Sequence, residues 1–194
     1  MLLGQLLKSV NKNHKKIHVS GICFDSRNVK KNNIFFAIKG KHTSGDRFIN
    51  DAILRGASAV IIDKSKKYKK YQIPLISVSD VRRSLSEACS NFYKKKPSNI
   101  IAVTGTNGKS SVADFFYQIL KLNRVSVASI GTLGISTKNY KKKTNLTSMD
   151  PLSLHENLQL IARKNINNVI LEASSHGLEQ KRLDHLKINT GIFT

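Results

Sequence analysis

An apolar run followed by two closely spaced glycines constrains this chain more than any other feature. Residues 101–111 read Ile-Ala-Val-Thr-Gly-Thr-Asn-Gly-Lys-Ser-Ser, and a helical pattern continues over residues 112–122. Glycines allow a tight turn that brings backbone N–H groups against phosphate oxygens. The N-terminus of the following helix adds unpaired donors and the positive end of its dipole. The stretch therefore predicts a phosphate-binding loop between a strand and a helix.

Two side chains of this loop suit a nucleotide bound with its metal ion. Lys109 can reach the β- and γ-phosphates as a point charge, and Ser110 offers a hydroxyl to Mg²⁺. The general P-loop pattern also requires a glycine five places before Gly108, where this chain has Val103. An ordinary strand-to-helix turn therefore stays open as the alternative interpretation.

The charge of the chain does not by itself indicate a nucleic-acid partner. The 194 residues carry a formal net charge of +21, which is compatible with binding to polyanions. However, the lysines cluster in residues 64–70, 94–96 and 141–143 without the interleaved aromatic residues that stack on bases. We expect a general enrichment in lysine and no specific nucleic-acid partner.

The cysteines and the N-terminus argue against a disulfide framework, a zinc site and a secreted protein. Cys23 and Cys89 are far apart and lack metal-ligand spacing, so we expect them to be small core residues. Residues 1–8 are too short and too interrupted for a signal peptide. No run approaches the roughly 18 apolar residues of a membrane span. We expect a cytoplasmic protein without membrane insertion.

Short apolar strands alternate with helical patterns, which predicts an α/β fold in layers. Helices are expected over residues 2–10, 48–54, 81–93, 112–122 and 151–164. Strands are expected over residues 18–24, 34–38, 59–62, 73–78, 99–103, 125–130, 168–172 and 188–193, with a polar loop over residues 136–150. Pro97 disfavours helix in the residue before it and marks a boundary. We predict a small α/β domain over residues 1–97 and a P-loop-type parallel-sheet domain over residues 98–194, incomplete because its last strand lacks a covering helix.

Four separated motifs resemble one known family across essentially the whole chain. Residues 104–111 resemble the ATP loop of the Mur ligases, a loop that itself lacks the first glycine of the general pattern. Residues 172–178, Glu-Ala-Ser-Ser-His-Gly-Leu, with Gln180 and Arg182 after them, resemble the signature of the branch that adds the third peptide residue in peptidoglycan synthesis. Residues 25–27 and 35–40 resemble the N-terminal uridine-nucleotide domain, and residues 147–151 resemble the substrate loop.

The resemblance implies an ATP-dependent ligase that uses Mg²⁺. ATP would phosphorylate the D-glutamate carboxylate of UDP-N-acetylmuramoyl-L-alanyl-D-glutamate, and an amine of a diamino acid would attack the acyl phosphate. Positioning and charge stabilisation would dominate such a reaction. By motif position, ATP would be held by Gly105, Thr106, Asn107, Gly108, Lys109, Ser110 and Ser111. Lys109 and Glu172 would be the catalytic residues, with Ser110 and Glu172 on Mg²⁺. The muramoyl-dipeptide part would contact Thr147, Ser148, Ser174, Gln180 and Arg182, and the uridine end Phe24 and Ser26.

Several alternatives stay open from the sequence. Glu172 could be a strand-end acid paired with a lysine, Ser174 and Ser175 could be helix caps, and Asp25 with Arg27 could form a simple turn ion pair. His176 suits a structural turn as well as it suits catalysis. The substrate-binding roles of Gln180 and Arg182 rest only on the signature around them.

The chain also departs from the family pattern. Ser110-Ser111 replace the commoner Thr-Thr, and Ser148-Met149 replace Thr-Pro. The sequence ends before the family's carbamylated lysine, a metal-binding histidine and the C-terminal domain, so we expect that it does not complete catalysis alone.

Other functions also stay open. A nucleotide-binding remnant without activity or a related ligase such as a folylpolyglutamate synthase is the alternative function. The choice of diaminopimelate over L-lysine follows family frequency only, and the oligomeric state is not predicted.

Overall fold

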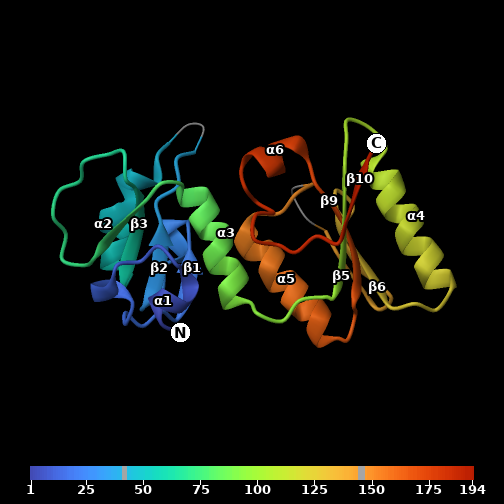
Figure 1. The fold of residues 1–194 in the computed structure, drawn as a ribbon, viewed down its shortest axis with the longest axis horizontal. Coiled ribbons are helices and arrows are strands. Elements are labelled where there is room, and N and C mark those ends of the chain that lie inside the picture. The colour runs from blue at the N-terminus through green and yellow to red at the C-terminus, as the bar shows by residue number, and fades with distance from the viewer. Residues whose placement is uncertain (41–42, 144–146) are drawn as a thin grey trace. The chain divides into compact units, whose positions relative to one another are not determined.

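A computed structural model describes residues 1–40, 43–143 and 147–194. The chain forms two compact units, residues 1–92 and 93–194 (Figure 1). The sequence placed the boundary at Pro97, which lies in the segment between the last helix of the first unit and the first strand of the second. Among the described residues, no helix has the length and apolar character needed to cross a membrane.

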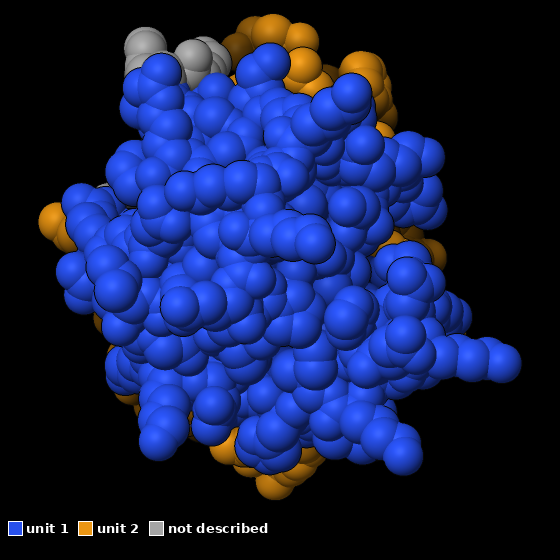
Figure 2. Space-filling view, turned by 90° about the vertical axis from the view of Figure 1, so that its left-hand side faces the viewer, with its two compact units in different colours: residues 1–92 blue, residues 93–194 orange. Residues whose placement is uncertain are grey.

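The first unit is a parallel four-stranded sheet with helices around it. Its strands are β1 (Gly21–Cys23), β2 (Asn33–Phe36), β3 (Ala59–Asp63) and β4 (Leu75–Val78), paired in the order β1-β2-β3-β4. Its helices are α1 (Leu3–Leu6), α2 (Ile49–Leu54) and α3 (Val81–Phe92), with 3₁₀ turns at Lys12–His14, Ser26–Asn28 and Gly45–Phe48. Phe35, Ile49 and Val60 are among the residues of its buried core. Figure 2 shows the face of this unit that is turned to the viewer, coloured blue.

The opening helix is shorter than the sequence predicted. Residues 2–10 carry leucines at helical spacing, but α1 ends at Leu6, and Leu7 is already extended at φ −132° and ψ 123°. Leu6, Leu7 and Val10 are all buried. Leu7 and Val10 are therefore buried on either side of a turn at residues 8–9, and the helix expected over residues 7–10 is wrong.

The second unit is a six-stranded sheet that is parallel over four strands. The strands pair in the order β10-β5-β9-β6-β7-β8, with β7 and β8 antiparallel. They are β5 (Asn99–Thr104), β6 (Val127–Gly131), β7 (Gly134–Thr137), β8 (Tyr140–Lys142), β9 (Asn168–Glu172) and β10 (Thr190–Phe193). The helices are α4 (Lys109–Leu122), α5 (Pro151–Arg163) and α6 (Ser175–Glu179). The α/β class is confirmed.

The two faces of this sheet are covered by different helices. Successive residues of a strand point to opposite faces, and β5 follows this rule. Ile100 lies in a buried cluster with Leu154 and Leu158 of α5. Ile101 lies in a second cluster with Ala113 of α4. The helix after the phosphate loop is therefore packed on one face, and the helix after residue 150 on the other.

Residues 136–150 are not the continuous polar loop that the sequence predicted. The chain turns tightly after β6, with Gly131 paired to Gly134, which has φ +98°. It then forms the hairpin of β7 and β8, which ends at Lys142. The side chains of β8 are exposed, so this strand gives no apolar pattern. Residues 144–146 of the expected loop lie outside the described residues.

Candidate nucleotide and metal site

The predicted phosphate loop joins β5 to α4, and its two glycines have backbone conformations that favour glycine. Gly105 has φ +141° and Gly108 has φ +79°. Gly108 is the N-cap of α4, which begins at Lys109. Residues with a Cβ rarely adopt these angles, so the loop depends on both glycines. The unpaired N–H groups of the first helical turn are available to an anion.

The ammonium of Lys109 folds back over this loop. Its Nζ donates to the carbonyl oxygen of Gly105 at 2.7 Å and to that of Thr106 at 3.0 Å. These contacts place a positive charge among the loop's peptide groups. Thr106, Asn107 and Ser111, which complete the predicted ATP contacts, are exposed. The Thr194 hydroxyl also donates to the carbonyl oxygen of Asn107.

Glu172 is a buried carboxylate at the end of β9, with a side chain that joins two other segments. Only 4% of the residue is exposed. Its Oε2 accepts from the hydroxyl of Ser110 at 3.0 Å, and its Oε1 accepts from the backbone N–H of Thr132 at 3.0 Å. The hydroxyl oxygen of Thr132 lies 2.9 Å from Oε2 and 3.0 Å from the hydroxyl oxygen of Thr147. The start of α4 and the turn after β6 thus meet at one carboxylate, and Thr147 is joined to it through the Thr132 hydroxyl.

The topology of the sheet explains why these residues meet. In a parallel sheet the loops after neighbouring strands lie at the same edge, where ligands bind. β9 pairs with β5 on one side and β6 on the other, so the residues after all three strands converge. Gly131 makes room for the carboxylate, because a Cβ there would overlap the Glu172 side chain. We did not predict Thr132 as a site residue, although its place after β6 was a usable signal.

This set of oxygens suits a magnesium ion. Mg²⁺ prefers hard oxygen ligands and keeps several water molecules, using one or two carboxylates together with substrate phosphates. Ser110 and Glu172 supply a hydroxyl and a carboxylate at the mouth of the phosphate loop. Within residues 1–40, 43–143 and 147–194, no group of three or more His, Cys, Asp or Glu residues could hold a metal. One hydroxyl and one carboxylate fit an ion whose other ligands are water and phosphate oxygens.

Ser148 and Ser174 form a second set of contacts beside Glu172. The hydroxyl oxygen of Ser148 accepts from the backbone N–H of Ser174 at 2.8 Å and lies 3.2 Å from the carbonyl oxygen of Glu172. The hydroxyl of Ser174 lies 3.1 Å from that of Ser148 and caps α6 by accepting from the N–H of Gly177 at 3.1 Å. The helix-cap interpretation of Ser174 is thus correct, and it does not exclude a contact with substrate.

Arg182 extends the same network. Its guanidinium donates through Nε and Nη2 to Oε1 of Gln180, at 3.1 and 2.7 Å, and through Nη1 to the carbonyl oxygen of Ser148. The side-chain nitrogen of Gln180 lies 2.7 Å from Nε2 of His176. The structure therefore brings the predicted residues Ser148, Ser174, Gln180 and Arg182 into one connected network.

The remaining predicted residues line a cavity of the first unit. The cavity has a volume of about 510 Å³. Its lining residues are Phe24, Asp25, Ser26, Arg27, Ile38, Gly40, Thr43, Gly45 and Phe48. Phe24 and Ser26, which the sequence assigned to the uridine end, therefore share one concave surface, while Ser110 and Glu172 lie in the other unit.

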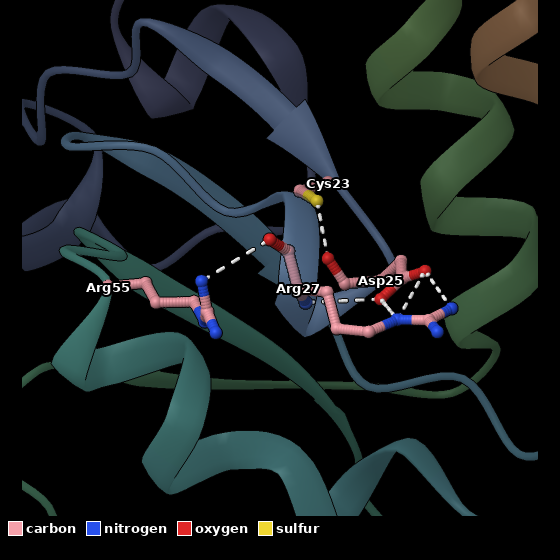
Figure 3. Close-up of polar contacts among 4 residues, drawn as sticks. All are labelled: Cys23, Asp25, Arg27 and Arg55. Atoms are coloured by element: carbon pink, nitrogen blue, oxygen red, sulfur yellow. Dashed lines mark hydrogen bonds and ion pairs between the residues drawn. The ribbon is translucent and has the colours of Figure 1, made fainter.

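The Asp25–Arg27 turn at this cavity is held by local contacts (Figure 3). Nη2 of Arg27 lies 2.7 Å from Oδ2 of Asp25, and the backbone N–H of Arg27 donates to Oδ1 at 3.1 Å. The hydrogen bond from Arg27 lowers the pKa of the Asp25 carboxyl. The thiol of Cys23 donates to the carbonyl oxygen of Asp25 at 2.9 Å, and Arg55 donates to that of Arg27 at 3.4 Å.

Ser26 lies between the two charged residues of this turn and is buried, with 5% of it exposed. Its hydrogen bond is the largest cause that lowers the pKa of Asp51, followed by that of Arg55. The turn is therefore joined to α2 by the Ser26 hydroxyl and by the hydrogen bond from Arg55 to the carbonyl oxygen of Arg27.

Two family models match the chain. Residues 18–93 match the model described as the Mur ligase family, catalytic domain, and residues 103–194 match the Mur ligase middle domain. The matched ranges correspond to the two compact units and together include both groups of predicted site residues.

Curated relatives and solved structures agree with these models. The chain is 44% identical over 184 residues to the UDP-N-acetylmuramoyl-L-alanyl-D-glutamate–2,6-diaminopimelate ligase of Rickettsia felis, covering 93% of this chain and 34% of the relative. It is 41% identical over 178 residues to the enzyme of the same name from Bradyrhizobium diazoefficiens, covering 92% and 36%. It thus spans about a third of the length of the curated relatives it matches.

A solved structure of an enzyme with that name has a TM-score of 0.84 at 26% identity, covering all of this chain and 40% of the other. The MurF ligase of Thermotoga maritima in complex with ADP, at 24% identity and a TM-score of 0.53, covers 79% of this chain and 32% of its own and shares the fold. The models, the relatives and the order of the motifs agree: the chain belongs to the Mur ligase family.

Proposed function

We propose that this chain provides the nucleotide-binding and substrate-binding parts of an ATP-dependent ligase. The ligase adds 2,6-diaminopimelate to UDP-N-acetylmuramoyl-L-alanyl-D-glutamate in the synthesis of peptidoglycan precursors. The identities to ligases of that name support both the reaction and the choice of diamino acid. We assign the reaction to the cytoplasm, where ATP is available.

One observation carries the proposal: a glycine-rich loop and a buried carboxylate meet through the 3.0 Å contact between Ser110 and Glu172. An ordinary strand-to-helix turn does not need a carboxylate buried beside it, since burying a charge is costly. The pairing is what a nucleotide with its metal ion requires, because the loop holds the phosphates and the carboxylate holds the cation.

In the proposed reaction, an oxygen of the D-glutamate carboxylate attacks the γ-phosphorus of ATP. An acyl phosphate forms, and ADP leaves. The amine of diaminopimelate then attacks the acyl carbon and loses a proton to solvent. The amide bond forms as phosphate departs with the electron pair of the C–O bond.

The chain's own residues would position the reactants for these steps. Lys109, now on the carbonyl groups of Gly105 and Thr106, would exchange these contacts for phosphate oxygens and offset their charge. Ser110 and Glu172 would hold Mg²⁺, which supplies charge neutralisation between phosphate groups when it is bound.

The two remaining groups of residues would bind the nucleotide sugar. Arg182, with Ser148 and Ser174, presents a cation and hydroxyls beside Glu172, which suits the carboxylates of the dipeptide. The cavity around Phe24 and Ser26 would receive the uridine end, where an aromatic side chain and a hydroxyl are available. The proposal thus assigns the phosphate loop to ATP and the residues of the other three motifs, apart from Glu172, to the nucleotide sugar.

Calorimetric titration of this chain with Mg-ATP tests the nucleotide site. Lys109→Ala should weaken binding at least tenfold, because it removes the charge over the loop. The control is Lys187→Ala, which removes an exposed lysine of the same unit. Equal affinities for the two variants would contradict the assignment of the loop.

The reaction itself is tested by ADP release in the presence of UDP-N-acetylmuramoyl-dipeptide with diaminopimelate or L-lysine. Because the chain spans about a third of the length of its relatives, the assay supplies the remaining part of a family enzyme, and we expect ADP release with diaminopimelate. Faster turnover with L-lysine, or ADP release with a folate acceptor instead, would contradict the proposed substrates.

A further inference from the structure

The second unit contains a cavity that none of the predicted site residues line. Its volume is about 720 Å³, which is within the size range of small-molecule sites. It is lined from the end of α4, the start of β6, the turn between β7 and β8, and the segment after α5. Val127 begins β6, whereas the phosphate loop follows the end of β5, and these strands run parallel through β9. The cavity therefore lies at the opposite edge of the sheet from the ATP loop.

Four cationic side chains line the cavity together with aliphatic and polar residues. The cations that line the cavity are Lys121, Arg124, Lys138 and Lys164. Val125, Val127 and Ile166 contribute aliphatic surface, and Tyr117 contributes a ring. Of the described residues that line the cavity, none is acidic. Lining residues that carry positive charge and apolar surface suit an anion that carries an apolar body.

The cationic groups are partly held in place by aromatic rings. Nζ of Lys121 lies 5.7 Å from the ring centroid of Tyr117, and Nζ of Lys164 lies 5.1 Å from that of Tyr140. These distances are in the range of cation–π contacts. The side chains of Lys121 and Lys164 are therefore oriented by contacts that leave their N–H donors available, unlike lysines that are paired with carboxylates.

A buried donor without a partner gives an independent indication of a ligand. The residue Tyr117 is 5% exposed, and its hydroxyl has no hydrogen-bond partner in the part of the chain that the structure describes. Buried hydroxyls are normally hydrogen-bonded, because an unpaired one loses its contact with water. Burial also raises the pKa of Tyr117, which keeps the hydroxyl protonated and able to donate.

We propose that this cavity is a binding site for an organic phosphate, with the phosphate group on the four cations and an apolar or aromatic body over Val127 and Ile166. Arginine and lysine are the usual partners of phosphate, and the Tyr117 hydroxyl supplies a neutral donor. The site is separate from the proposed ATP site and does not depend on it.

The test is a titration of the ¹⁵N-labelled chain with phenyl phosphate, followed by NMR. It uses the Lys109→Ala background, so that binding at the phosphate loop is weakened. We expect saturable shifts at residues 117–127, 137–139 and 164–166. Phenol alone, which lacks the phosphate group, should give no saturable shift. Shifts confined to residues 105–111 would overturn the proposal, as would saturable binding of phenol.

Charge-removing variants locate the site. Lys138→Ala with Lys164→Ala should weaken phenyl phosphate binding at least tenfold. The matched control, Lys67→Ala with Lys70→Ala, removes the same charge from exposed positions of the first unit and should change affinity less than twofold. Equal losses in the two double variants would show a non-specific effect of net charge and overturn the site.

Tyr117→Phe keeps the ring and removes only the hydroxyl. We expect a loss of affinity of about threefold or more, with the dispersion of the NMR spectrum unchanged. An unchanged affinity would overturn the part of the proposal that uses this hydroxyl. Displacement of phenyl phosphate by a DNA duplex with a steep dependence on salt would instead identify a general polyanion surface and overturn the small-molecule site.

Discussion

Each unit contains an acidic residue in a family motif, and the two carboxylates have opposite surroundings. In the first unit, 30% of the Asp25 side chain is exposed, and its partner Arg27 is 82% exposed and two residues away. In the second unit, Glu172 is 4% exposed and joins the start of α4 to the turn after β6. One carboxylate is held within a turn, and the other holds distant segments together.

This difference predicts that the two binding sites differ in rigidity before a ligand binds. An exposed ion pair contributes little to stability because water and salt screen it, so the Asp25–Arg27 turn can rearrange around a ligand at small cost. A buried carboxylate must keep its hydrogen bonds, since leaving it or its donors unpaired is costly. The proposed metal site of the second unit should therefore be rigid before any ligand binds, and the cavity of the first unit should be adaptable.

The largest expected effect comes from removing the buried carboxylate. Glu172→Ala leaves the Ser110 hydroxyl and the Thr132 N–H without their acceptor and should lower the free energy of unfolding by about 3 kcal/mol. It should also abolish tight Mg-ATP binding. Urea denaturation and calorimetry measure the two effects. Glu179→Ala, at a side chain that is 79% exposed, is the control. A loss of stability no larger than that of the control would contradict the conclusion that Glu172 holds distant segments together.

Gly131 tests whether close packing around the Glu172 carboxylate contributes to stability. In Gly131→Ala the added Cβ would overlap the Glu172 side chain, which should cost about 2 kcal/mol of stability. Gly191→Ala is a matched control in a strand of the same sheet, because a Cβ there has no neighbour within 4 Å among the described residues. If both variants unfold at the same urea concentration, Glu172 is free to move.

The contrast between buried and exposed ionisable groups extends to a histidine of the second unit. His155 is fully buried, and neither ring nitrogen has a partner within the described ranges. Burial lowers its pKa to about 3, with further contributions from Lys96 and His185. The folded state therefore keeps the ring neutral, and below pH 6.5 the unfolded state binds the proton more readily.

Stability should consequently fall by about 2 kcal/mol between pH 6.5 and pH 5 through this group. His155→Leu should remove that part of the pH dependence in urea denaturation. His18→Gln, at an exposed position of the first unit, should leave it in place. A pH profile that is the same in His155→Leu and the wild type would show that the folded state accommodates the proton.

The sequence predicted those parts of the candidate site that depend on residues adjacent to one another in the sequence. The loop at residues 105–111 follows from its glycines and the helix after it. The local pattern placed Glu172 at the end of an apolar strand and offered Ser174 as a helix cap, whereas their roles at a site came only from the resemblance to the Mur ligases. In each case the local pattern and the tertiary structure agree, because β5 and β9 are buried strands.

The parts that failed depend on contacts between distant residues. The strand β8 has only exposed side chains, so nothing in its pattern distinguishes it from a loop. It forms by pairing with β7, which itself turns back on β6 at Gly131 and Gly134. Thr132 became a site residue through pairing of β6 with β9, which places it beside Glu172. Residues 7–10 looked helical because their burial matched a helical spacing.

The smallest expected effect is that of Asp25→Asn. This substitution keeps the shape of the side chain, and the amide oxygen can still accept from the backbone N–H of Arg27, which lies 3.1 Å from Oδ1. Arg27 lowers the pKa of Asp25, so the pair stabilises the fold above the ordinary pKa of an aspartate and is lost as the pH falls below it.

At pH 7 the urea midpoint of Asp25→Asn should move by less than about one-fifth of the shift seen in Glu172→Ala, because exposed pairs contribute little. Its effect should appear instead in the affinity for UDP-N-acetylmuramoyl-dipeptide, since the turn lines the cavity of the first unit. The control is Asp63→Asn, which changes a carboxylate that likewise accepts from a backbone N–H two residues later, that of Ser65, and that does not line the cavity. A loss of stability equal to that of Glu172→Ala would show that the exposed turn is as rigid as the buried site, and the distinction between the two units would then fail.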